Sequence, residues 1–304
     1  MNNKRITDGI IGLTVGDALG VPYEFSKIET MQQSPCTDMI GYGTWNRPKG
    51  SWSDDTSMTL ATIGGLIRHK GKINYESIMR EFIRWIVNGD YTQDGDVFDF
   101  GITTEDALNN YLNGIPAEEC GGVSEHNNGN GSLMRILPLV WTDADYETIG
   151  KVSGLTHATD RCKIACSLYV EIGRQILSDL NHEYTFCEHV ATASDLIKDY
   201  YKGNDELKHF QRIFDVDYTD GVVSSGYVVN TLECAIYCIR EEPSYRDALL
   251  RAVNLGGDTD TVGAVCGGLA GLYYGFDDIP TEWIDCIRGV DYVYDLCNKF
   301  ESIL

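Results

Sequence analysis

Apolar residues recur at three- and four-residue intervals through most long segments of this 304-residue chain, while alternating strand-like runs are scarce and short. A period of 3.6 residues places such residues on one face of an α-helix, whereas a strand needs a period of two. The pattern predicts helices over 6–19, 56–69, 75–87, 161–180, 186–201, 225–240, 245–252 and 262–274. The expected fold class is therefore all-α, with glycine-rich or polar connections between the helices.

The domain organisation follows from what the chain lacks. No low-complexity linker, internal repeat or block of like charge marks a boundary along it. A chain of this length with 43% hydrophobic residues is long enough to bury one substantial core. We expect a compact single domain of many helices over residues 1–304. The functional motifs then fall at junctions between loops and helices, where loops carry function on a rigid scaffold.

The charge of the chain restricts its partners. A formal net charge of −22 argues against broad nucleic-acid binding, which needs clustered Lys and Arg. No apolar run approaches the roughly eighteen residues that a membrane span needs, and the N-terminal segment does not resemble a signal peptide. We therefore expect no membrane span and a cytoplasmic location. A monomer is favoured, although the sequence leaves the oligomeric state open.

The ten cysteines do not predict disulfides or a zinc site. Cys162 and Cys166, like Cys234 and Cys238, lie four residues apart in apolar helical surroundings. Neither pair has a His at the spacing of a zinc site. Free Cys in such surroundings behaves as a small hydrophobe. These four are expected to be structural thiols.

Two short acidic motifs lie about two hundred residues apart, Ser53-Asp54-Asp55-Thr56 and Asp258-Thr259-Asp260-Thr261. Carboxylates and hydroxyls without Cys or His suit Mg²⁺, Mn²⁺ or Ca²⁺ better than zinc or copper. If the fold brings the motifs together, they supply enough oxygen ligands for two divalent ions in one cleft. The alternative is that each Asp only caps a helix. The candidate metal ligands are Ser53, Asp54, Asp55, Asp258, Asp260 and Thr261.

Two further carboxylates are candidates for proton transfer. Glu24 lies in a Val-Pro-Tyr-Glu-Phe setting, where apolar neighbours can raise its pKa and suit it to general acid chemistry. An ordinary surface Glu is the alternative. Asp99 stands between Phe98 and Phe100, a poor place for a solvated charge. Asp17, in Gly-Asp-Ala-Leu-Gly, is expected to be structural instead, accepting hydrogen bonds from loop N–H groups.

A turn-rich stretch predicts an anion site. Successive backbone N–H groups in such a turn can hold a pyrophosphate, although an ordinary glycine loop looks the same. Arg135, which follows it, is expected to pair with an acidic residue of the scaffold. The small residues of the helix predicted over 262–274 indicate a close helix–helix approach beneath the site. The candidate substrate-binding residues of the turn are Asn127, Asn128, Gly129, Asn130, Gly131 and Ser132.

The residues around these motifs resemble those of the ADP-ribosylglycohydrolases. The matching blocks include Gly16-Asp-Ala-Leu-Gly20, Trp52-Ser-Asp-Asp-Thr56 and Gly256-Gly-Asp-Thr-Asp-Thr261. Others cover 98–104, 128–135 and 156–157, in the family's order. A single Asp-Asp-Thr would be a worthless signature, but five or six ordered blocks over almost the whole chain are highly specific. The family often has Thr where this chain has Ser53, and either hydroxyl can ligate a metal.

The resemblance implies a fold, a cofactor and an activity. It implies the same all-α fold, with a binuclear cleft that holds two divalent cations, Mg²⁺ or Mn²⁺, between the acidic motifs. It places Glu24 beside the metals in catalysis or gating, Asp99 near the reacting ribose, and His157 at the distal ribose or the phosphates. The implied activity is hydrolysis of the glycosidic bond between ADP-ribose and an acceptor.

The substrate would be an ADP-ribosylated protein or small molecule, and arginine, serine, a base or a small molecule remain open as acceptor. Two other functions are considered. One is a non-catalytic ADP-ribose-binding or structural relative, which loss of a metal ligand would mark. The other is a binuclear-metal nucleotide phosphohydrolase, which would release phosphate rather than intact ADP-ribose.

Overall fold

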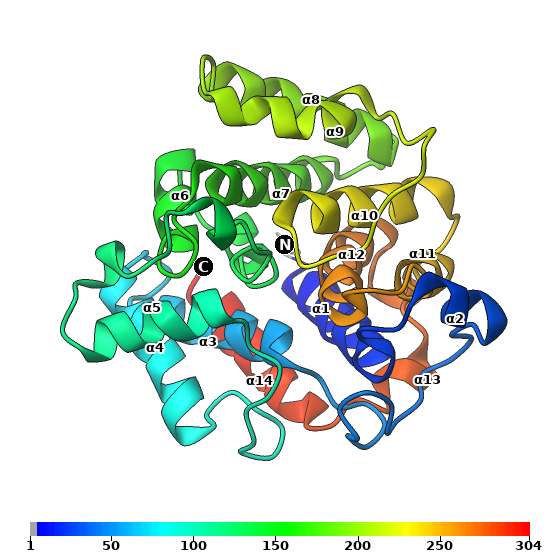
Figure 1. Cartoon of the computed structure of the whole chain (residues 1–304), viewed down its shortest axis with the longest axis horizontal. Helices are drawn as coiled ribbons and strands as arrows, with labels where there is room; N and C mark the ends of the chain where they lie inside the picture. The colour runs from blue at the N-terminus through cyan, green and yellow to red at the C-terminus, as the bar shows by residue number, and fades with distance from the viewer. Residues whose placement is uncertain (1–4) are drawn as a thin grey trace.

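The computed structural model describes residues 5–304, and their secondary structure is helical (Figure 1). Within that range there is no β-strand, and the only extended pairings are two isolated bridges, Gly122 with His157 and Gly129 with Tyr227. The predicted all-α fold class is confirmed. The single-domain assignment over 1–304 stays a prediction.

Residues 5–304 form α-helices of very different lengths, joined by loops and short 3₁₀ helices. The α-helices are α1 (Ile6–Gly20), α2 (Ile28–Gln33), α3 (Asp54–Arg68), α4 (Tyr75–Asn88), α5 (Ile102–Leu112), α6 (Tyr146–Ser153), α7 (Asp160–Ser178), α8 (Phe186–Tyr200), α9 (Gln211–Asp215), α10 (Val228–Glu241), α11 (Tyr245–Asn254), α12 (Thr259–Tyr274), α13 (Thr281–Ile284) and α14 (Val290–Glu301). The 3₁₀ helices are η1 (Val21–Tyr23), η2 (Ala117–Glu119), η3 (Glu125–Asn127), η4 (Leu137–Trp141), η5 (Asp205–Phe210) and η6 (Phe276–Asp278).

Helices α1 and α12 form the centre of the molecule, and the others pack around them. In Figure 1, α10 and α11 flank α12, α7 lies alongside α10, and α8 with α9 forms an outer layer over α7. Helices α3, α4 and α14 cover another side, with α5 beside α4. The first and last thirds of the chain therefore meet at the core, which carries the two acidic motifs to the same place.

The contact between α1 and α12 depends on glycine. A Cβ on Gly16 would lie 2.0 Å from the carbonyl oxygen of Gly263, and one on Gly267 would lie 2.2 Å from that of Gly12. Glycines four residues apart share one helix face, so each helix presents a stripe without side chains to the other. Each Gly costs roughly 1 kcal/mol of helix propensity relative to Ala, and here the backbones come into direct contact in return. The predicted close approach beneath the site is confirmed.

The eight predicted helices all exist, with ends that differ by up to three residues. Six further α-helices were not predicted from the sequence. Helices α2, α9 and α13 have only four to six residues each, too few for a periodicity to show. Helix α5 buries just Thr104, Ala107 and Leu108 along its eleven residues. Helices α6 and α14 were also missed.

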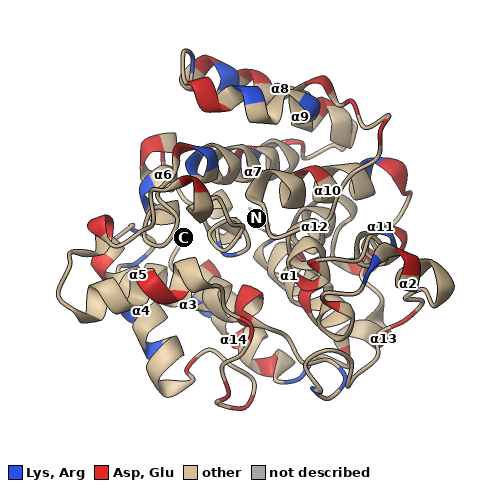
Figure 2. Ribbon diagram, viewed as in Figure 1, with Lys and Arg blue, Asp and Glu red and all other residues tan. Residues whose placement is uncertain are grey.

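Of the expectations that rest on composition, the structure tests the cysteines. All ten cysteines are free, and Cys162, Cys166, Cys234 and Cys238 are buried, as expected of structural thiols. Within residues 5–304, no helix combines the length and apolar character that crossing a bilayer requires. Figure 2 shows Lys and Arg scattered among more numerous Asp and Glu over many helices. The cytoplasmic location, the monomeric state and the lack of nucleic-acid binding stay predictions.

Candidate active site

Asp17, near the end of α1, fixes the start of α3. Its carboxylate accepts hydrogen bonds from the backbone N–H groups of Ser53 (2.9 Å) and Thr56 (3.0 Å) and from the Thr56 hydroxyl (2.6 Å). Ser53 is the N-cap of α3, its hydroxyl accepting from the N–H of Asp55. Asp54 and Asp55 therefore occupy the first helical turn, where the helix dipole favours carboxylates. The structural role expected of Asp17 is confirmed.

A backbone pairing holds Glu24 beside the start of α12. The N–H of Gly257 donates to the carbonyl of Ser26 (2.8 Å), and the N–H of Phe25 donates to the carbonyl of Gly257 (2.7 Å). Gly257 has a φ of 70°, the left-handed conformation that favours glycine. This turn leads directly into Asp258, the N-cap of α12. Glu24 and the second acidic motif are thus fixed relative to each other through the main chain.

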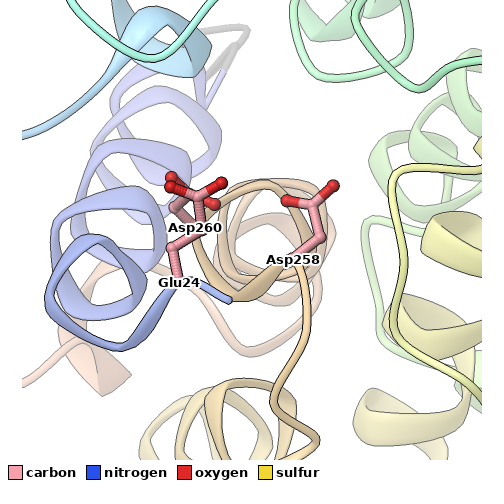
Figure 3. A group of neighbouring side chains, drawn as sticks. All are labelled: Glu24, Asp258 and Asp260. Atoms are coloured by element: carbon pink, nitrogen blue, oxygen red, sulfur yellow. The ribbon is translucent and has the colours of Figure 1, made fainter. Parts of the chain in front are cut away.

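The structure brings the two acidic motifs together at the starts of α3 and α12. The Thr261 hydroxyl lies 3.5 Å from the Asp55 carboxylate across this junction. Glu24, Asp258 and Asp260 each present an oxygen within 4.8 Å of the others. Figure 3 shows these three carboxylates pointing to the same side, with those of Glu24 and Asp260 overlapping in this view. Glu24, expected to transfer protons, is therefore also placed where it can ligate a metal.

Asp99 joins this group from the loop between α4 and α5. Its carboxyl lies against those of Glu24 and Asp260. Its φ of 62° is the left-handed conformation, which costs a non-glycine residue roughly 1–2 kcal/mol. The aromatic ring of Trp45 packs 5.5 Å from that of Phe98, and its indole N–H donates to Glu24. The packing of Trp45 on Phe98 supports the segment that carries Asp99 in spite of this cost.

Burial and mutual repulsion dominate the electrostatics of the cluster. Burial, and then the neighbouring carboxylates, raise the pKa values of Asp54, Asp55 and Asp260 well above the usual range. Burial and the charge of Asp99 raise the pKa of Glu24 to about 9. One oxygen each of Asp55 and Asp260 is buried without a hydrogen-bond partner among residues 5–304. Buried carboxylate oxygens without partners are costly unless a cation or a proton compensates them.

The residues present fit divalent cations. The donors are all oxygens, no Cys or His of residues 5–304 stands among them, and two buried carboxylate oxygens lack other partners. Hard ions such as Mg²⁺ and Mn²⁺ prefer this chemistry. The Ser53 hydroxyl already bonds to Asp55 within its own helix turn. The assignment of Ser53, Asp54, Asp55, Asp258, Asp260 and Thr261 as ligands stays a prediction, as does the number of ions.

A cavity of about 530 Å³ opens over the cluster. Its volume falls within the 300–1,000 Å³ of typical small-molecule sites. A larger hollow of about 900 Å³, beside Arg5 and Asp8, contains none of the predicted site residues. The predicted residues that line the smaller cavity are Glu24, Asp54, Asp99, Gly129, Asn130, Gly131, His157, Asp258 and Thr261. Ser53, Asp55 and Asp260 are buried and do not line it.

Several lining residues had been given no role from the sequence. Phe25, Trp45, Met134 and Gly226 line the cavity, as do residues 101–104 at the start of α5. The N-cap of α5 is Gly101, which has no side chain to satisfy the free N–H groups of the first turn. The Thr-Thr pair at 103–104 belongs to a block that matches the family. This resemblance was the one sequence signal that could have assigned these two residues to the site.

Some residues of the 127–132 turn line the cavity, and the side chains of others hold the loop in place. The side chains of Asn127 and Asn128 bond to Thr103 and Thr159, and that of Ser132 bonds to Ser153, so all three hold the loop. The N–H groups of Asn127 and Asn130 already donate to backbone carbonyls. The N–H groups of 128, 129, 131 and 132 donate to no backbone carbonyl within residues 5–304. Any anion cradle here therefore rests on those four amides.

Arg135 differs from expectation. Its guanidinium is fully buried and lies 4.6 Å above the ring of Phe82. One nitrogen, Nη2, donates to the Thr156 hydroxyl (2.8 Å) and to the carbonyl of Val152 (3.2 Å). No carboxylate among residues 5–304 pairs with it. The predicted acidic partner is thus wrong, because carbonyls, a hydroxyl and an aromatic face surround the charge instead.

We expect His157 to stay neutral throughout about pH 5 to 8. Burial, and then the charge of Arg135, lower the pKa of His157 to about 3. In a proton-detected NMR titration, the chemical shifts of the His157 imidazole should not change over that range. The same signal in urea-unfolded protein should titrate near about 6.5. A folded-state midpoint close to 6.5 would contradict the buried environment.

Comparisons with known proteins settle the family. A family model of ADP-ribosylglycohydrolases matches residues 2–303. The chain belongs to the ADP-ribosylglycohydrolase family. It is 30% identical over 300 residues to the ADP-ribosylarginine hydrolase Tri1 of Serratia proteamaculans, covering 95% of this chain and 77% of that protein. It is 31% identical to the ADP-ribosyl-dinitrogen reductase glycohydrolase of Rhodospirillum rubrum, covering 93% of this chain and 90% of that protein.

A solved structure supports the same assignment. A protein described as an ADP-ribosylglycohydrolase-related protein complex superposes with a TM-score of 0.81 at 26% identity. The match covers 99% of this chain and 98% of that one. The fold and the family resemblance predicted from the sequence are both confirmed.

Proposed function

We propose that this protein hydrolyses the glycosidic bond between ADP-ribose and a modified acceptor, releasing intact ADP-ribose. One observation carries the proposal. The residues that line one cavity form two groups, a buried carboxylate cluster and a helix N-terminus with the His157 imidazole, whose Nε2 has no hydrogen-bond partner among residues 5–304. The first suits metal ions and a ribose diol, and the second suits a pyrophosphate. The names of two relatives in the same family, an ADP-ribosylarginine hydrolase and an ADP-ribosyl-dinitrogen reductase glycohydrolase, support the proposal.

The pyrophosphate would lie at the start of α5. The unsatisfied N–H groups of its first turn carry partial positive charge, and the hydroxyls of Thr103 and Thr104 stand beside them. Gly129 and Gly131 also line the cavity, and Gly131 lies close to the start of α5, since a Cβ there would be 3.1 Å from the Thr104 hydroxyl. This orientation directs the ribose that carries the acceptor toward Glu24, Asp99 and Asp258.

The chemistry would be divided between the carboxylates and the bound ions. Water adds to the anomeric carbon, the bond to the acceptor breaks, and the acceptor leaves with a proton. Glu24 and Asp99 would share the two proton transfers, because their carboxyls adjoin each other at the cavity wall. Asp54, Asp55, Asp258 and Asp260 would hold the ions. Mg²⁺ or Mn²⁺, when bound there, would supply Lewis acidity.

Arginine is the acceptor that we favour. Four carboxylates, those of Glu24, Asp54, Asp99 and Asp258, line the cavity, and no Lys or Arg within residues 5–304 does. A guanidinium is thus attracted to the same place where its bond to ribose must break. The relative from Serratia proteamaculans bears the name of an ADP-ribosylarginine hydrolase.

The decisive assay uses matched peptides that carry ADP-ribose on arginine or on serine. With Mg²⁺, and separately Mn²⁺, we expect intact ADP-ribose and unmodified arginine peptide by mass spectrometry, and much slower release from serine. Faster release from the serine peptide would identify serine, rather than arginine, as the preferred acceptor. Release of AMP or phosphate would identify a phosphohydrolase. Tight ADP-ribose binding without any product would identify a non-catalytic relative.

A further inference from the structure

His157 lines the cavity beside the glycines of the 127–132 turn. Its main chain is held by Gly122, which accepts from the N–H of Ala158 (2.8 Å) and donates to the carbonyl of Thr156 (3.0 Å). The imidazole packs against Gly131, where a Cβ would lie 2.8 Å from Cε1. The residue is 3% exposed and lines the cavity, and Nε2 has no hydrogen-bond partner among residues 5–304. This nitrogen is available to a ligand.

The other nitrogen of the ring is engaged. His157 Nδ1 lies 2.9 Å from the hydroxyl of Thr156, which is fully buried. The same hydroxyl oxygen is 2.8 Å from Nη2 of Arg135. Arg135, Thr156 and His157 thus form a continuous chain of hydrogen bonds from a buried cation to the cavity.

The direction of these hydrogen bonds follows from what each group can do. A guanidinium only donates, so the Thr156 oxygen accepts from Arg135. The Thr156 hydroxyl proton then has one acceptor within reach in the described structure, which is His157 Nδ1. If Nδ1 carried the proton and donated instead, the hydroxyl proton would be buried without an acceptor, which is unfavourable. In a neutral imidazole the ring proton then resides on Nε2.

We propose that Arg135, acting through the Thr156 hydroxyl, fixes His157 as the neutral tautomer that presents an Nε2–H donor to the cavity. Arg135 and Thr156 are positioning residues in this arrangement, since neither lines the cavity. Doubly protonated His157 is disfavoured because it would need Nδ1 to donate beside a buried guanidinium. The ligand group that contacts His157 Nε2 must therefore be a hydrogen-bond acceptor, a phosphate or ribose oxygen if the proposed function holds.

The absence of a carboxylate beside Arg135 in the described part of the chain fits this role. A paired carboxylate would cancel the cation, whereas here the positive charge stays behind His157 in a chain of net charge −22. The cavity thus has carboxylates in its lining and an uncompensated cation behind His157. That polarity favours one orientation of a ligand with an anionic pyrophosphate and a cationic acceptor.

The tautomer is measured directly by long-range ¹H–¹⁵N correlation on protein with ¹⁵N-labelled histidine. We expect wild-type His157 to show a protonated Nε2 and an unprotonated Nδ1 without any ligand. This readout does not depend on the proposed function. An Nδ1–H tautomer in the folded wild-type protein would overturn the inference even if every variant failed to fold.

The Thr156→Val variant removes the hydroxyl with little change in volume. We expect His157 to lose its single tautomer and the affinity for ADP-ribose, measured by calorimetry, to fall about tenfold, as for one lost hydrogen bond. Thr156→Ser should restore both. Thr62→Val is the matched control, because Thr62 is equally buried but donates only to Met58 within α3. An unchanged tautomer and affinity in Thr156→Val would contradict the proposal.

The outcomes separate this inference from the proposed function. If His157 carries its proton on Nε2 but no form of the protein binds ADP-ribose, the proposed function fails while the inference about the His157 tautomer stands. If ADP-ribose binds and His157 carries its proton on Nδ1, the inference about the tautomer fails while the proposed function stands.

Discussion

The Asp260→Asn variant should lose turnover by about a hundredfold or more, because metal ions at such sites contribute several kcal/mol of transition-state stabilisation. Asp260 is buried, and one of its oxygens lacks a partner among residues 5–304. It lies within 4.8 Å of ligand-competent oxygens of Glu24 and Asp258. Asparagine keeps the shape but removes the charge, so metal affinity and turnover should fall together.

Thermal unfolding with and without divalent ions provides the second readout. After chelator treatment, millimolar Mg²⁺ or Mn²⁺ should raise the melting temperature of the wild type, since a ligand at a hundred times its Kd adds roughly 2.7 kcal/mol. The rise should shrink in Asp260→Asn. Without metal, the variant should be at least as stable as the wild type, because one of several mutually repelling carboxylates is gone.

Asp106→Asn is the matched control for charge. Asp106 is exposed on α5, so the same substitution there should change neither turnover nor the metal-induced shift. A wild type that gains no stability from either ion, or an Asp260→Asn variant with normal turnover, would remove Asp260 from the proposed metal site.

The Gly16→Ala variant should be strongly destabilised. The new Cβ would lie 2.0 Å from the carbonyl oxygen and 2.5 Å from the carbonyl carbon of Gly263. Both are backbone atoms, so the clash is relieved only by moving α1 away from α12. Overpacking of this kind typically costs about 1–3 kcal/mol and occasionally more, a large part of a total stability of roughly 5–15 kcal/mol. Urea unfolding should show the loss as a lower midpoint.

The matched control is Gly150→Ala in α6. There the nearest atom to a new Cβ is Cγ of Lys163 at 3.4 Å, an ordinary contact with a flexible side chain. Alanine has higher helix propensity than glycine, so this variant should gain up to about 1 kcal/mol. Equal stability losses at the two positions would mean that the α1–α12 contact is not what requires glycine at Gly16. Turnover of Gly16→Ala should also fall, since α1 and α12 position Glu24 and Asp258.

The sequence indicated the helices with long apolar periodicity but not those with short or weak patterns. Helix α7 buries most of its nineteen residues, and its pattern is correspondingly clear. Helix α5 rests on three buried positions and begins at the cavity, where its first residues stay open to a ligand. Periodicity reports burial against a core, so an element placed for function rather than packing leaves little signal.

The family resemblance extended the prediction to a site. It selected Glu24 and Asp99 among forty-six acidic residues, and both line the cavity over the cluster. Of the turn residues it supported, Gly129, Asn130 and Gly131 also line the cavity, while Asn127, Asn128 and Ser132 point their side chains into the scaffold. Motif matching identifies a segment, but not which atoms of the segment face the ligand.

By itself, the sequence determined the helical class, the acidic character of the site and the small-residue face of α12, because local spacing and residue chemistry encode these properties. Only the tertiary structure decided which residues contact each other across the chain. Thr261 meets Asp55 across 206 positions of the chain, and Arg135 meets Thr156 rather than a carboxylate. Such contacts depend on how helices distant in sequence pack, and no local pattern specifies which buried atoms will face each other.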